Sequence, residues 1–122
     1  MKKNKIGISV VCLLVFSLFA VGNASASDNP TFCKDRQFIN AIAVGDIPQL
    51  HLGGDVGNDV FVQFVDDSKW YPLNKNRNLN NSMGPSILAT LNNAMVMRLP
   101  VTIADHYGIR CDDFDEVIVW RD

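Results

Sequence analysis

The 122-residue sequence holds few side chains in patterns that could support catalysis. It has no GxSxG nucleophile motif, no HExxH metal motif and no glycine-rich phosphate loop. Its two histidines, His51 and His106, are the candidates for general acid–base chemistry near neutral pH. A small hydrolase would need one of them beside an acid or a serine in a deep pocket, and the sequence shows no such convergence. We therefore predict a protein that is not an enzyme and needs no cofactor.

The densest group of potential metal ligands is acidic and consists of Asp105, Asp112, Asp113, Asp115 and Glu116. Carboxylates are the oxygen donors that Ca²⁺ prefers. Their spacing is not that of an EF-hand loop, and no DxDxDG sequence occurs. The sequence therefore predicts a solvated acidic turn and no metal site.

Aromatic and amide side chains offer a different chemistry, the binding of a polar ligand. Trp70 and Tyr71 are adjacent in a short expected strand, so one ring should enter the core and the other should meet solvent. An exposed aromatic ring is a platform for a sugar or a partner surface. The segment 74–81 that follows is rich in asparagine, whose amides suit sugar hydroxyls. Trp70, Tyr71, Asn78 and Asn80 are the candidate ligand-binding residues.

Residues 1–26 have the features of a secretory signal peptide. Three lysines open the chain, an uncharged and mostly apolar stretch covers 6–21, and a small-residue cleavage site ends at Ala26. An uncleaved anchor helix is the alternative, although the apolar stretch is short for a membrane span. Cleavage would leave 27–122 as a single domain without a membrane span, secreted or kept in the periplasm.

Cleavage changes the charge balance, because the first 26 residues carry three of the 11 basic residues and none of the 13 acidic ones. Eight basic and 13 acidic residues remain, so the mature net charge is −5 with neutral histidines. Binding to nucleic acid needs a basic surface, and this balance argues against it.

Two cysteines, Cys33 and Cys111, remain in the mature chain. An exported chain with two cysteines most simply forms one disulfide. The bond would tie the start of the domain to its last strand. It would close a loop of nearly 80 residues, which is worth roughly 4 kcal/mol in the chain-entropy model. A reactive thiol pair or a metal site is the alternative, but the chain has no CxxC and a zinc site would need further ligands nearby.

Hydrophobic periodicity predicts five strands and one helix in the mature chain. The expected strands are a bent or bulged one over 32–48 and shorter ones over 60–65, 69–73, 101–107 and 116–121. Apolar residues at three- and four-residue spacing predict a helix over 82–99, which Pro100 ends. These elements favour a small five-stranded barrel of mainly β structure, with the helix between the third and fourth strands. An open antiparallel sheet with the helix on one face is the alternative.

The segment from Ile87 to Trp120 resembles a known family. It runs as helix, then Leu99-Pro100-Val101-Thr102-Ile103, then Cys111, then Val117-Ile118-Val119. This order is similar to the C-terminal half of the pentamer-forming binding subunits of bacterial AB toxins, in the subtilase cytotoxin and pertussis-like groups, and to small secreted proteins of unknown role. The resemblance implies an OB-fold barrel whose cysteines tie its strands. Leu99-Pro100 stands where many of these subunits have glycine, several carry more than one disulfide, and no matching sugar-contact motif occurs near the N-terminus.

The resemblance also implies a function. The expected protein is a secreted, toxin B-subunit-like binder that recognises a host-cell glycan, assembles as a homopentamer and delivers a catalytic A-type subunit. In such a ring, several weak sites combine into useful avidity. The alternative is a periplasmic or secreted interaction or inhibitor protein that binds another protein through its acidic surface and has no toxin role.

Overall fold

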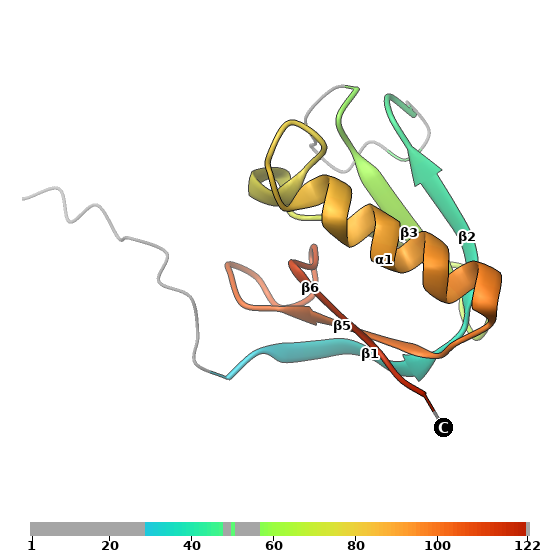
Figure 1. Cartoon of the computed structure of the whole chain (residues 1–122). Coiled ribbons are helices and arrows are strands. Elements are labelled where there is room, and N and C mark those ends of the chain that lie inside the picture. The colour runs from blue at the N-terminus through green and yellow to red at the C-terminus, as the bar shows by residue number, and fades with distance from the viewer. Residues whose placement is uncertain (1–28, 48–49, 51–56, 122) are drawn as a thin grey trace, which may run out of the picture.

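The computed structural model describes residues 29–47, 50 and 57–121 (Figure 1). The expected signal peptide and His51 lie outside the described residues. Within them the elements are β1 (Thr31–Gln37), β2 (Ile39–Val44), β3 (Val60–Phe64), β4 (Trp70–Pro72), the short 3-10 helix η2 (Lys75–Arg77), α1 (Gly84–Met97), β5 (Val101–Asp105) and β6 (Glu116–Val119). No helix in this part of the chain is long and apolar enough to cross a membrane.

The strands form two antiparallel sheets of three, in the orders β1-β5-β6 and β2-β3-β4. The chain passes directly from β1 to β2 at Phe38, so the predicted bent strand is found as two strands that serve different sheets. Two register shifts in β1 and the left-handed backbone of Arg36, with φ of 49°, accompany this bend. Irregularities of this kind are how a strand changes direction and sheet.

The structure corrects the prediction of a closed five-stranded barrel. The described residues form six strands in two sheets, and their arrangement is not clearly OB-like. Besides the passage at Phe38, the β-bridge that joins the two sheets in the described part of the chain is a parallel one between Leu73 and Phe114. Strand β4 is three residues long and contains Pro72, which lacks the backbone N–H that a continued ladder would need. The two sheets are therefore not joined by a continuous ladder of backbone hydrogen bonds, which a closed barrel would need.

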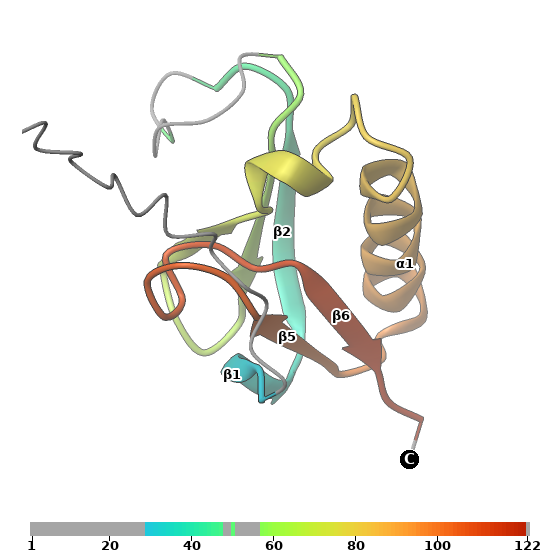
Figure 2. The same ribbon diagram turned by 90° about the vertical axis from the view of Figure 1, so that its left-hand side faces the viewer.

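Helix α1 lies between β4 and β5 in sequence, as predicted, and packs against β2 and β6 (Figure 2). Its buried face consists of Ile87, Leu91 and Ala94, which recur at helical spacing. They meet the inward residues of both sheets in one apolar core, which includes Val60, Val62, Phe64, Val101, Ile103 and Phe114. Arg98 caps the C-terminus of the helix: its backbone is left-handed, and its N–H donates to the carbonyls of Ala94 and Met95.

The predicted disulfide between Cys33 and Cys111 is confirmed. It joins β1 to the segment 106–115 between β5 and β6, which we call the 106–115 turn, rather than to the last strand. A second tie crosses from β1 to the β3–β4 connection, where the Lys34 ammonium lies 2.7 Å from an Asp67 carboxylate oxygen. This hydrogen bond is the main reason that the pKa of Asp67 falls to about 2.

Candidate functional site

The two aromatic candidates from the sequence lie on opposite faces of β4. Tyr71 is buried in the core and its hydroxyl donates to an Asp67 carboxylate oxygen at 2.9 Å. Trp70 is half-buried. The predicted division between an inward and an outward ring is therefore found, and the Tyr71 ring has little surface left for a ligand.

The two amide candidates also differ. Asn78 is fully buried, and its Nδ2 donates weakly to an Asp59 carboxylate oxygen at 3.4 Å. Asn80 is exposed. None of Trp70, Tyr71, Asn78 and Asn80 lines the hollows described below.

A cluster of polar side chains lies instead at the 106–115 turn, where buried carboxylates accept hydrogen bonds from the backbone. Asp105 ends β5 and is 4% exposed. Its two carboxylate oxygens accept hydrogen bonds from the backbone N–H groups of Tyr107 and Cys111, at 2.9 and 2.8 Å. One side chain thus fixes both ends of the tight part of the turn, where Gly108 and Cys111 have positive φ.

His106 is held between two acids at the other end of the turn. Its Nδ1 lies 2.6 Å from an oxygen of the buried Asp115, and its Nε2 lies 3.3 Å from an oxygen of Glu116. Asp115 also accepts from the backbone N–H of His106. The prediction of a solvated acidic turn is wrong for Asp105 and Asp115, which are buried because they accept hydrogen bonds from the turn itself.

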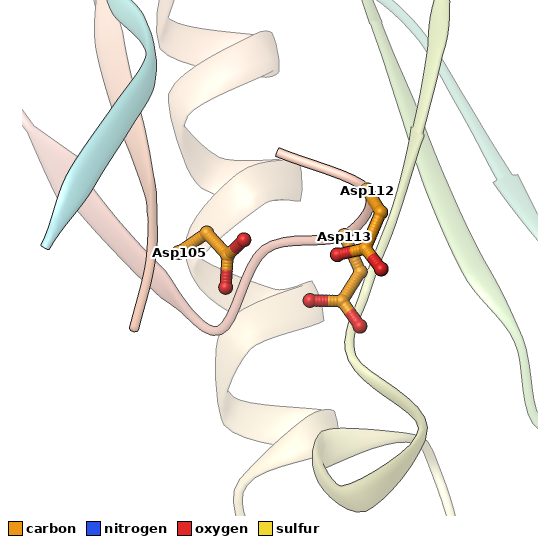
Figure 3. A group of neighbouring side chains, drawn as sticks. All are labelled: Asp105, Asp112 and Asp113. Carbon is orange, nitrogen blue, oxygen red and sulfur yellow. The ribbon is translucent and has the colours of Figure 1, made fainter. Parts of the chain in front are cut away.

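Three carboxylates form a tight group, the carboxylate cluster of Asp105, Asp112 and Asp113. Figure 3 shows Asp105 reaching from the end of β5 toward the other two, and one oxygen of each lies within 4.8 Å of the others. An oxygen donor set for Ca²⁺ needs six to eight ligands. Asp105 already uses both oxygens on backbone N–H groups, so two carboxylates remain and we assign no metal.

Asp113 is the least satisfied member of this cluster. Its Oδ2 accepts from the Asn74 side chain at 3.0 Å, whereas its Oδ1 is buried without a hydrogen-bond partner. Burial and, next, the charges of the neighbouring carboxylates raise its pKa to about 6, against the lowering effect of the Asn74 hydrogen bond. A carboxyl that titrates there carries a proton in mildly acidic solution.

Three hollows meet around Tyr107, and we call them the Tyr107 hollows. The first is bounded by Asn74, Asn76, Arg77 and Tyr107 and has a volume of about 220 Å³. The second has about 270 Å³ and is lined by Arg77, Met83, His106, Tyr107, Asp115 and Glu116. The third has about 130 Å³ and is lined by Asn29, Thr31, Asp105, His106, Tyr107, Gly108 and Arg110. Tyr107 is the residue common to all three.

The asparagine-rich segment supplies one wall of these hollows through Asn74. Its Oδ1 accepts from the N–H of Asn76 and caps the start of η2, while its Nδ2 donates to Asp113. Its backbone N–H donates to the carbonyl of Phe114 at 2.8 Å. One side chain therefore connects η2 to the 106–115 turn, and η2 in turn presents Asn76 and Arg77 to the first hollow.

The comparisons with known proteins find no relative. The chain matches no protein-family profile, and neither the curated proteins nor the solved structures include a significant match. No comparison therefore connects the chain to the binding subunits of AB toxins.

Proposed function

We propose that the protein is a carbohydrate-binding protein whose ligand occupies the Tyr107 hollows. The observation that supports this is that Tyr107 and two polar residues of η2, Asn76 and Arg77, line the same hollow. A tyrosine ring offers an apolar surface to the C–H face of a sugar. Amide and guanidinium groups beside it offer donors and an acceptor for the hydroxyls.

The size of the hollows bears on the ligand. Pockets for drug-sized molecules have roughly 300–1,000 Å³ and bury most of the ligand. The two larger Tyr107 hollows have about 220 and 270 Å³, so each accepts one unit of a longer ligand. This fits a surface site for the end of a glycan. In this proposal the aromatic residue that contacts the sugar is Tyr107 and not Trp70.

We further propose that this binder is exported and acts as a toxin B-subunit-like protein toward a host-cell glycan, with or without a catalytic partner. The Cys33–Cys111 disulfide is compatible with export, because such bonds persist in oxidising compartments.

Replacing Tyr107 with alanine should weaken glycan binding at least about tenfold, a loss of ~1.4 kcal/mol. The oxidised mature protein is first screened on a glycan array, and the dissociation constant of the best ligand is then measured by calorimetry. Arg77→Ala should lower affinity in the same assay, because Arg77 lines both larger hollows.

Ile109→Ala is the matched control, because Ile109 is exposed in the same turn and lines none of the three hollows. Its affinity should equal that of the parent protein. Unchanged binding by the Tyr107 variant, together with a loss in Trp70→Ala, would return the site to β4. An array without any bound glycan would reject the carbohydrate assignment itself.

A second candidate function, assembly with another protein chain, is favoured by an apolar groove of about 360 Å³ at the end of α1. Phe38, Val65 and Met95 line it and are 47%, 67% and 40% exposed, and Val96 and Met97 are exposed on the same helix. Exposed apolar patches of this kind mark interaction sites. We propose a second copy of the chain as the occupant, as the expected homopentamer requires.

Light scattering after size exclusion should then give the mass of a homo-oligomer for the oxidised mature protein. Met95→Glu places a charge in the groove and should shift the mass to that of a monomer, because burial of an unpaired charge is strongly unfavourable. Asn92→Glu, at an exposed position one turn earlier on α1, is the control and should leave the mass unchanged. A monomeric parent protein would exclude self-assembly of the isolated chain.

A further inference from the structure

Two members of the carboxylate cluster are connected to the walls of the Tyr107 hollows. Asp105 lines the third hollow and fixes the backbone N–H groups of Tyr107 and Cys111. Asp113 holds the amide of Asn74, which lines the first hollow. The relative positions of these two walls therefore depend on Asp105 and Asp113, which belong to the carboxylate cluster.

The surroundings of Asp113 leave one of its carboxylate oxygens without a hydrogen-bond partner. Its Oδ1 is buried and accepts no hydrogen bond, and Asp113 shares the carboxylate cluster with Asp105 and Asp112. The groups that surround it are Asn74 from the segment before η2, Asp105 from β5, Asp112 in the turn, and Asp115 with its partner His106. The Lys69 ammonium donates to the carbonyl of Cys111 in the same turn. A proton is the simplest species that would neutralise this buried carboxylate.

We propose that the 106–115 turn is a proton-dependent lock, in which one proton on Asp113 closes the turn and fixes the walls of the Tyr107 hollows. The proton comes from solvent and lowers the charge of the cluster from −3 to −2. Without that charge, Asp113 no longer repels the carboxylates of Asp105 and Asp112. At neutral pH the three charges repel, and the turn opens more often.

The direction of the pH dependence follows from the pKa of Asp113. That pKa is about 6 in the folded protein and 3.8 in the unfolded chain, so the folded state takes up the proton first. The stabilisation is fully present below about pH 4 and is lost as the pH rises through about 6. This device goes beyond the proposed function, and it can be tested without any glycan.

Asp113→Asn tests the lock at a fixed pH, because the amide mimics the protonated acid and keeps the bond to Asn74. Arg110 is exposed in the turn, so trypsin can cleave after it when the turn opens. At pH 8 the variant should be cleaved there about tenfold more slowly than the parent protein. A pKa difference of about two units can change the opening equilibrium by at most roughly a hundredfold, so a tenfold effect lies within that limit. Fragments are reduced before mass analysis, since Cys111 links them to Cys33.

Asp112→Asn is the matched control, because it removes the same charge from the same cluster at an exposed side chain. It should slow cleavage clearly less than Asp113→Asn does, because solvent screens the exposed Asp112 carboxylate and its charge contributes less to the repulsion. A carbon NMR titration of the parent protein gives the second measurement, and the Asp113 carboxyl should titrate near pH 6. Equal cleavage of parent and Asp113→Asn, or an Asp113 carboxyl that titrates near pH 4, would overturn the proposal.

Discussion

Removing the disulfide should destabilise the protein more than any other conservative change, by about 4 kcal/mol. Cys33 and Cys111 are 78 residues apart, and the chain-entropy model gives that value for a loop of this length. The double variant Cys33→Ala/Cys111→Ala should therefore show a large fall in the urea concentration at the midpoint of unfolding. The expected loss is a large part of the stability of a domain of this size, about 5–15 kcal/mol.

A local effect should accompany this loss. Cys111 donates its N–H to Asp105 and has a left-handed backbone, so the disulfide holds the turn that carries Tyr107. Reduction of the parent protein with dithiothreitol should reproduce the lower midpoint of the double variant. The same reductant should leave the double variant itself unchanged, which serves as the control. A double variant as stable as the parent would mean that the bond adds no constraint to the unfolded chain.

Local pattern was sufficient to predict most of the elements. Alternating apolar residues place β3 at Val60–Phe64 against the predicted 60–65, and helical spacing places α1 at Gly84–Met97 against the predicted 82–99. The buried faces of these elements are set by their own periodicity. The first and last residues of these elements differ from the predicted ones because they depend on contacts with other parts of the chain. Helix α1, for example, begins at Gly84, which lies against the main chain of Asn78.

The barrel could not be corrected from the sequence, because its closure depends on pairing between distant strands. The register shifts in β1 and the single bridge from Leu73 to Phe114 involve backbone groups that carry no composition signal. Strand pairing of this kind is decided by tertiary packing and not by the local preference of a residue.

The candidate site was missed for a related reason. Composition alone predicts a solvated asparagine-rich segment, but Asn74 and Asn78 are buried because their amides bind acids and backbone groups. Tyr107 lies beside Arg77 only because Asp105 and the disulfide close the 106–115 turn. The one available signal was Asp105-His106-Tyr107 at the end of a strand, followed by further acids, which is typical of a turn shaped by carboxylates.

Gly84→Ala is expected to destabilise the protein, although replacing glycine with alanine in a helix usually stabilises it. In a helix, alanine is favoured over glycine by roughly 1 kcal/mol. At position 84, however, an added Cβ would overlap with the main-chain carbonyl groups of Asn78 and Arg77. Backbone atoms cannot rotate away as a flexible side chain can, so either α1 or the end of η2 must move. We expect a net loss of at least about 3 kcal/mol, at the upper end for overpacking.

The displacement should also reach the Tyr107 hollows, because Arg77 lines the two larger ones. Urea unfolding measures the stability loss, and glycan affinity measures the effect on the site. Ser86→Ala, at an exposed position in the same first turn of α1, is the control and should change stability by less than about 0.5 kcal/mol. If Gly84→Ala were neutral or stabilising, helix propensity would have outweighed the overlap, and the close contact between the start of α1 and the Asn78 carbonyl would be wrong.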